Sequence, residues 1–156
     1  MSRPGAAKRS LLLVTTGLLH ETFGHLFRRS HLRSQQAFAR AFDGYGLSPL
    51  QYGILELVML NPGISHGELA EAMVTAPSVV TTAMKPLRRD GLLEEKTPPG
   101  DARRSGYRLS DKGEAYFLSL QERILDAEEL LVGPLSAAER RTLKRLLQRL
   151  AAGGRL

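Results

Sequence analysis

The apolar residues of this chain recur mostly at intervals of three or four, the spacing that places side chains on one face of an α-helix. One short stretch instead alternates apolar and polar residues, as a half-buried β-strand does. The helical pattern is longest over residues 11–42 and ends at the glycine-containing residues 43–46. The predicted order is four helices, a two-stranded hairpin and two further helices, over residues 11–42, 48–60, 65–74, 78–91, 92–97 with 105–110, 111–131 and 136–152.

Several of these helices carry recognisable start and stop signals. A serine followed three residues later by Gln or Glu is the pattern of a capping box, in which each residue bonds the other's backbone N–H. The three pairs are Ser48 with Gln51, Ser65 with Glu68, and Ser136 with Glu139. Ser110 is expected to cap the helix over residues 111–131, and Gly91 is expected to end the helix before the hairpin.

The helix predicted over residues 78–91 has two different faces. Four polar side chains recur at three- or four-residue spacing and share one face: Ser78, Thr81, Thr82 and Lys85. Three apolar side chains are expected to turn inward against Leu69 and Met73: Val79, Ala83 and Leu87. Pro86 has no N–H to bond the Thr82 carbonyl, so we expect it to kink or shorten the helix.

Composition narrows the function classes. The 156 residues suit a single domain over residues 1–156, and 42% apolar residues suffice for a core. The absence of cysteine excludes disulfides, thiolate metal sites and thiol redox sensing. The net charge is +6, with Lys and Arg concentrated in residues 1–40 and 77–112 and absent from residues 41–76, which favours a polyanionic partner bound on one side.

The N-terminal segment is not expected to be a membrane or secretion signal. Its apolar run after Arg9 is too short to span a bilayer and has no small-residue cleavage site. Residues 1–10 are predicted to be a flexible basic tail. We therefore expect a cytoplasmic protein that does not contact a membrane.

Residues 48–109 have the layout of a winged helix-turn-helix: a scaffold helix, a short helix, a turn, a second helix and a hairpin. The fold class expected is mainly α with a small β-hairpin (α+β). In such a domain the second helix of the pair enters the major groove and reads base edges. The hairpin tip, with two prolines, a glycine, Asp101, Arg103 and Arg104, is suited to a minor groove or its phosphates.

The stretches LSPLQYGILELV, GELAEAM, RRDGLLEEK and DARRSGYRLSDKG, with the flanking helices, resemble the MarR family of bacterial transcription regulators. The resemblance implies a homodimer built from residues 11–47 and 111–152, bound to a pseudo-palindromic operator and often released by a small aromatic acid or phenol. Carried onto this chain, it assigns double-stranded DNA contacts to Pro77, Ser78, Thr81, Thr82, Lys85, Arg88, Asp101, Arg103 and Arg104. The dimer interface is expected to include Leu19, Phe23, Leu143, Leu146, Leu147 and Leu150.

The chain departs from the family pattern at two positions. Pro86 interrupts the recognition helix, and Lys96 ends the first strand where the family more often has an arginine after an acid. The DNA contacts expected from residues after Lys85, including Arg88, depend on how Pro86 affects the helix. A phosphate contact at the end of the first strand depends on whether Lys96 can replace the arginine.

The resemblance further implies association with the bacterial nucleoid and a small-molecule effector bound in a cleft beside the first helix. An aromatic carboxylate or phenol would suit a cleft lined by aromatic and cationic side chains there, and the candidates are His20, Arg28, His31, Arg33, Tyr45 and Tyr52. The histidines of the first helix are spaced by five and six residues rather than four, so no metal site is expected. No cofactor is expected either.

The function predicted is a sequence-specific DNA-binding regulator, a repressor released by its effector. No nucleophile with a supporting base, phosphate loop or metal cluster is present in the sequence, so an enzyme is not expected. Two alternatives stay open. One is a chromosome-associated protein that binds DNA without sequence preference, and the other is a protein-interaction module that uses the winged fold as a docking surface.

Overall fold

The computed structural model describes residues 17–96 and 106–153, and the chain forms two compact units, residues 1–32 and 33–156. In the first unit η1 (Gly17–Glu21) is a 3-10 helix and α1 (Phe23–Ala41) begins after Thr22. The single helix predicted over residues 11–42 is therefore wrong over residues 17–22, and its predicted first residues, 11–16, lie outside the described residues. Gly17, the first residue of η1, has φ of 55°, so a continuous α-helix cannot run through it, and the Thr22 hydroxyl donates to the Leu19 carbonyl at 2.9 Å.

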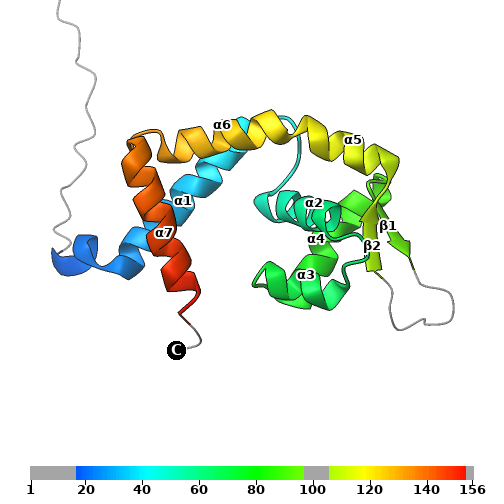
Figure 1. The fold of residues 1–156 in the computed structure, drawn as a ribbon, viewed down its shortest axis with the longest axis horizontal. Helices are drawn as coiled ribbons and strands as arrows, with labels where there is room; N and C mark the ends of the chain where they lie inside the picture. Colours follow the sequence, from blue (N-terminus) through cyan, green and yellow to red (C-terminus); the bar gives the residue numbers. More distant parts are fainter. Residues whose placement is uncertain (1–16, 97–105, 154–156) are drawn as a thin grey trace, which may run out of the picture. The chain divides into compact units, whose positions relative to one another are not determined.

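The remaining elements follow the predicted order (Figure 1). They are α2 (Pro49–Leu60), α3 (His66–Ala72), α4 (Pro77–Arg89), β1 (Leu93–Lys96), β2 (Gly106–Leu109), α5 (Asp111–Ser119), α6 (Gln121–Val132) and α7 (Ala137–Ala151). The two strands pair antiparallel, with Leu93 opposite Leu109 and Lys96 opposite Gly106. A mainly helical fold with one small hairpin is confirmed.

The capping boxes form as the sequence predicts. Ser48, Ser65 and Ser136 each accept a bond from the backbone three residues on and have their own N–H bonded by the Gln or Glu there. The serine N–H and hydroxyl bonds to Glu68 and Glu139 lower the pKa of both carboxyl groups. The start of each of these helices is therefore encoded locally.

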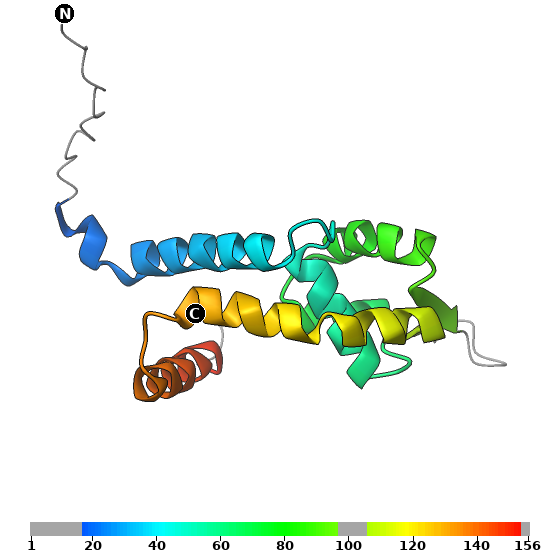
Figure 2. The same cartoon turned by 90° about the horizontal axis from the view of Figure 1, so that it is seen from above.

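The helix predicted over residues 111–131 is wrong in one respect, because the structure divides it into α5 and α6 at Leu120. The Leu120 N–H bonds to the Phe117 carbonyl, three residues back, at 3.0 Å. The last turn of α5 is therefore tighter than an α-helical turn, in which the bond spans four residues. The Leu120 side chain is fully buried. Figure 2 shows α5 and α6 following one another nearly end to end, so the break is local and is held by core packing.

The core of residues 33–156 combines an aromatic cluster with an aliphatic one. Phe38, Phe42, Tyr52 and Phe117 meet with ring centroids 4.0 to 6.3 Å apart. The fully buried aliphatic side chains are Ile54, Leu55, Val58, Leu69, Val80 and Leu120. This core lies under α2, α3, α4 and α5 and fixes how the helix-turn-helix is held.

The predicted inward face of α4 is wrong at one residue. Val80 is 0% exposed, whereas Val79 is 43% exposed. The buried stripe is Val80, Met84 and Leu87, at i, i+4 and i+7, and Ala83 lies at its margin. Because Val79 and Val80 are adjacent, the sequence allows two apolar stripes on this helix, one beginning at each valine. Packing against Leu69 and the rest of the core selects the stripe that begins at Val80.

Pro86 does not shorten α4, which continues to Arg89. The helix ends one turn later with Gly91 at φ of 70°, where the Gly91 N–H bonds to the Arg88 carbonyl and the Leu92 N–H bonds to the Leu87 carbonyl. The Gln51 side chain donates to the Ala83 carbonyl at 3.1 Å, within the turn that Pro86 interrupts. A side chain from α2 thus supports the backbone that the proline weakens.

Because only one of the two valines is buried, their truncation should have unequal effects. We expect Val80→Ala to lower the free energy of unfolding by about 2 kcal/mol through lost burial and the remaining cavity. Val79→Ala is the matched control and should change it by less than about 0.5 kcal/mol. Urea denaturation at one fixed protein concentration measures both, and equal losses would contradict the assignment of the inward face.

Candidate nucleic-acid interface

The turn between α3 and α4 sets the position of the second helix. Val74 has φ of 49°, a left-handed conformation, and its side chain is exposed. The Thr75 N–H bonds to the Ala70 carbonyl at 3.0 Å and closes the turn. Pro77 then occupies the first turn of α4, where a missing N–H costs nothing.

The outward face of α4 carries the polar side chains that the sequence singles out. Ser78, Thr81, Thr82 and Lys85 are all exposed and lie opposite the buried stripe. The Thr81 hydroxyl donates to the Pro77 carbonyl at 3.1 Å, and the Thr82 hydroxyl donates to the Ser78 carbonyl at 3.0 Å. The four side chains therefore share one solvent-facing surface, as predicted from their spacing.

The cationic end of α4 is partly engaged within the protein. Arg88 forms an ion pair with Glu95 of β1 at 3.0 Å. Arg89 bonds to Asp90 at 2.9 Å, and this bond lowers the pKa of the Asp90 carboxyl. Both pairs are exposed and contribute little to stability. Lys85, one turn earlier, lies on the same surface as the two threonines.

His66, the first residue of α3, contacts the start of α4. Its Nε2 lies 3.0 Å from the Pro77 carbonyl oxygen and 3.2 Å from the Thr81 hydroxyl oxygen. Its ring meets Tyr107 of β2 edge-on, with centroids 6.3 Å apart. Burial raises the pKa of the Tyr107 hydroxyl. His66 carries no signal in the sequence that assigns it a role, because a lone histidine has no spacing pattern.

The base of the wing is fixed to the α2–α3 connection. The Tyr107 N–H bonds to the Ile64 carbonyl at 2.9 Å, and the Gly63 N–H bonds to the Tyr107 carbonyl at 2.8 Å. A Cβ on Gly106 would lie 2.1 Å from the Gly63 carbonyl oxygen, so only glycine fits this approach. Lys96 ends β1 as an exposed residue, and the predicted tip residues Asp101, Arg103 and Arg104 lie outside the described residues.

The serine and glycine after β2 have a structural explanation. Ser110 accepts the Gly113 N–H at 3.0 Å, and its hydroxyl donates to the Gly91 carbonyl at 2.6 Å. A Cβ on Gly113 would lie 2.1 Å from the Leu92 carbonyl oxygen. The sequence from Ser110 to Gly113 therefore joins the start of α5 to the end of α4.

Two of the candidate effector residues, Tyr45 and Tyr52, line different hollows. Tyr52 is buried in the core and lines a hollow of about 180 Å³ between α1, α2 and α6. Tyr45 lines a different hollow, of about 340 Å³, beside Pro86 and Tyr116. Burial raises the pKa of the Tyr52 hydroxyl.

The cationic members of the same set are divided between the two units. Arg33 donates to the Leu130 and Leu131 carbonyls, at 3.1 and 3.0 Å, and Leu131 also lines the smaller hollow. His20, Arg28 and His31 belong to residues 1–32, and there the His20 ring meets the His25 ring at 5.5 Å.

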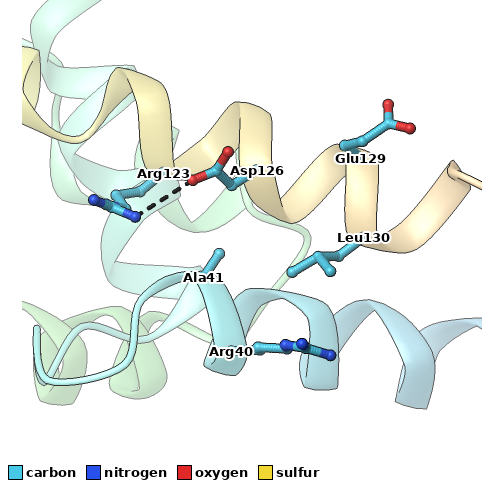
Figure 3. A pocket seen from close by; sticks show the side chains of 6 residues that line it. All are labelled: Arg40, Ala41, Arg123, Asp126, Glu129 and Leu130. Atoms are coloured by element: carbon cyan, nitrogen blue, oxygen red, sulfur yellow. Dashed lines mark hydrogen bonds and ion pairs between the residues drawn. The ribbon is translucent and has the colours of Figure 1, made fainter.

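A further hollow of about 360 Å³ lies between the end of α1 and α6 (Figure 3). Charged side chains line much of it, and Arg123 pairs with Asp126 across one turn of α6 at 3.4 Å. Glu129 at its margin is held by Arg140 of α7 at 2.6 Å, which lowers the pKa of the Glu129 carboxyl. Its two arginines are balanced by two carboxylates and none of its lining residues is aromatic, so this hollow offers less to an aromatic ring than the one lined by Tyr52.

The leucines assigned to the dimer interface are exposed in the single chain. Leu143, Leu146, Leu147 and Leu150 are 39 to 64% exposed, and α7 has no buried residue. In the first unit Leu19 and Phe23 are also exposed. Within the described residues, no helix is long and apolar enough to cross a membrane, and no group of His, Asp and Glu could hold a metal ion.

Comparison with known proteins gives one consistent result. Residues 45–104 match the MarR family. A Thauera aromatica protein described as a transcriptional regulatory protein for the hcr operon is 30% identical over 145 residues, which cover 92% of this chain and 87% of that protein.

Two solved structures share the fold over most of both chains. The PcaV transcriptional regulator from Streptomyces coelicolor, in complex with its natural ligand, is 28% identical with a TM-score of 0.76 and covers 86% of this chain and 94% of that one. The transcriptional repressor CouR, bound to a 23-mer DNA duplex, is 26% identical with a TM-score of 0.80 and covers 86% and 96%. From its length-wide similarity and its winged helix, the chain belongs to the MarR family and is a transcription regulator rather than an enzyme.

Proposed function

We propose that this chain is a sequence-specific repressor that binds duplex DNA as a homodimer and leaves it when a phenolic ligand binds. The observation that carries the proposal is the division of α4 into a fully packed inner face and an outer face of Ser78, Thr81, Thr82 and Lys85. A helix held in this way, after a tight turn and before a hairpin, suits the major groove. CouR, which shares the fold, is bound to DNA in its solved structure.

The proposed DNA contacts differ in kind. Pro77 and Ser78 lie at the start of α4, where the positive end of the helix dipole attracts a phosphate, although Pro77 itself has no N–H to donate. Thr81 and Thr82 suit base edges, and Lys85 suits a phosphate or a guanine. Arg88 is held by Glu95, so its contact requires that pair to open. The wing contacts of Asp101, Arg103 and Arg104 remain part of the proposal on sequence grounds alone.

The hollow beside Tyr52 is the effector site that the geometry supports best. At about 180 Å³ it exceeds the cavity of about 150 Å³ that holds one benzene, and Phe38 and Tyr52 supply aromatic walls. Glu128 also lines it, and a carboxylate accepts a hydrogen bond from a hydroxyl but repels another carboxylate. We therefore favour a ring bearing a phenolic hydroxyl, with any acid group directed toward Arg33, which bonds the carbonyl of the lining residue Leu131.

The homodimer proposal rests on the exposed leucines of α7. A stripe of this kind on a helix with no buried residue leaves apolar area in water unless another surface covers it. Arg140 fixes the start of α7 through Glu129 and the Leu135 carbonyl, at 2.6 and 2.9 Å, so the stripe is presented by an anchored helix. A second copy of this chain is the partner we propose.

Selection from a random pool of duplexes tests the DNA-binding proposal. We expect a pseudo-palindrome whose half-sites are about 10 base pairs apart, bound more than about tenfold tighter than random duplex. Lys85→Ala should weaken binding and reduce the slope of log K against log salt by about one, whereas Lys144→Ala on α7 should not. Discrimination below about tenfold would favour the chromosome-coating alternative, and no binding at low salt would favour the protein-interaction module.

Ligand titration tests the effector site. We expect 4-hydroxybenzoate to raise the melting temperature and weaken operator binding by about 5- to 150-fold, and benzoate, which lacks the hydroxyl, to act much less. Ala127→Leu should fill the hollow and abolish the response while operator binding without ligand persists. Tyr45→Phe, in the other hollow, is the control that should respond normally. If no phenolic acid changes either quantity, the assignment of this hollow is wrong.

Light scattering after size exclusion tests the dimer. Leu147→Asp places a charge in the middle of the proposed seam and should convert the protein to monomer at micromolar concentration. Leu60→Asp introduces the same charge at an exposed leucine of α2 and should leave the dimer intact. A wild-type monomer, or two variants that behave alike, would contradict the proposed interface.

A further inference from the structure

We infer that His66 is a positioning residue that holds the Thr81 hydroxyl as a hydrogen-bond acceptor, so that Thr81 selects a base with an exposed amino group, adenine or cytosine. The inference rests on the proposed function, in which α4 enters the major groove. It assigns a role to a side chain of α3 that does not itself lie on the outward face of α4.

The hydrogen positions follow from the two contacts of Nε2 and from the bond between Thr81 and Pro77. The Pro77 carbonyl oxygen accepts hydrogen bonds and has no hydrogen to give. An Nε2 without a hydrogen would place two lone pairs against each other at 3.0 Å, which is repulsive. The imidazole therefore carries its hydrogen on Nε2, and this holds for the neutral ring and for the protonated ring alike.

The Thr81 hydroxyl is left with one favourable arrangement. Because Nε2 already carries a hydrogen, the hydroxyl cannot donate to it across the 3.2 Å contact and instead accepts a share of that hydrogen. The hydroxyl hydrogen goes to the Pro77 carbonyl at 3.1 Å. With its hydrogen used inside the protein, the oxygen offers a lone pair to the groove.

Thr82 provides an internal comparison. Its hydroxyl also donates to the helix backbone, at 3.0 Å from the Ser78 carbonyl oxygen, but among residues 17–96 and 106–153 no ring nitrogen bonds its oxygen. A hydroxyl held at one point can rotate its hydrogen toward a base acceptor, whereas Thr81 is held at two points. The two adjacent threonines are therefore expected to differ in how strictly they read a base.

The chemistry of the major groove turns this difference into a preference. Adenine presents its N6 amino group there and cytosine its N4 amino group, whereas guanine presents O6 and N7 and thymine presents O4. An acceptor oxygen bonds the amino groups and is repelled by the carbonyl oxygens. It is likewise unsuited to a phosphate, which also accepts only.

The surroundings of His66 keep its ring in place. The ring is half-buried, and Tyr107 of the wing base contacts it edge-on. His66, Thr81, Met84, Lys85, Arg88 and Tyr107 together line a hollow of about 310 Å³ beside α4. The ring is thus supported from β2 and directed at the first turn of α4.

Two substitutions separate the hydrogen-bond donor from the ring. His66→Phe keeps an aromatic ring beside Tyr107 and removes the Nε2 donor, while His66→Gln keeps an N–H donor and removes the ring. The experiment first selects duplexes from a random pool with the full-length wild type and both variants. The base position read by Thr81 is the one at which Thr81→Val changes the preference. Affinity is then measured for operators that carry each of the four bases at that position.

We expect the wild type to prefer adenine or cytosine at that position by about fivefold to tenfold, as one hydrogen bond allows. His66→Phe should lose most of that preference, and His66→Gln should retain most of it. In a Thr81→Val background His66→Phe should cause no further loss of preference. The salt dependence should stay unchanged throughout, because no phosphate contact is removed.

Four results would overturn the inference. They are a preference for guanine or thymine in the wild type, an unchanged preference in His66→Phe, a uniform loss of affinity for every duplex in both variants, and a salt slope lowered by about one, which indicates a direct phosphate contact. A wild-type protein that selects no sequence at all would instead overturn the proposed function, and the inference with it.

Discussion

Burial of one face of α4 is the interaction on which the rest of the structure depends. Val80, Met84 and Leu87 enter the core formed by α2, α3 and α5, and their burial determines which way every other side chain of α4 points. Had Val79 been the buried valine, the helix would be rotated by about 100°, one residue of a 3.6-residue turn. Ser78, Thr81, Thr82 and Lys85 would still share one face of the helix, but that face would be turned in a different direction.

Three side chains from other elements add direction to that packing by bonding backbone carbonyls of α4 and its cap. His66 reaches the Pro77 carbonyl at the start, Gln51 reaches the Ala83 carbonyl in the middle, and Lys112 reaches the Asp90 carbonyl at the end, at 2.7 Å. Apolar burial alone tolerates small sliding of a helix, whereas hydrogen bonds fail beyond a few tenths of an ångström. Apolar burial and these hydrogen bonds together fix both the rotation of α4 about its axis and its position along that axis.

The same bonds connect α4 to the hollow proposed for the effector. Gln51 lies in the first turn of α2, between Pro49 and Tyr52, which both line that hollow. Its amide group donates to α4, and its oxygen accepts the Ser48 N–H at 2.9 Å. The capping box of α2 is therefore also the contact that supports α4 beside Pro86. Any displacement of this turn acts directly on the helix proposed to read DNA.

Local signals in the sequence determined the capping boxes, the hairpin, the end of α4 at Gly91 and the outward polar face, because each depends on residues within one or two turns of the chain. The family motif could also be recognised in the sequence. The structure adds the reason for its glycine, because a Cβ on Gly113 would collide with the Leu92 carbonyl oxygen. The tertiary structure alone decided which valine is buried, where α5 gives way to α6, and that α4 continues past Pro86. It also separated Tyr45 from Tyr52 and brought His66 against Thr81, fifteen residues away. These outcomes depend on packing and hydrogen bonds between segments that are distant in the sequence. No local pattern of residues in one sequence predicts which distant segments will meet.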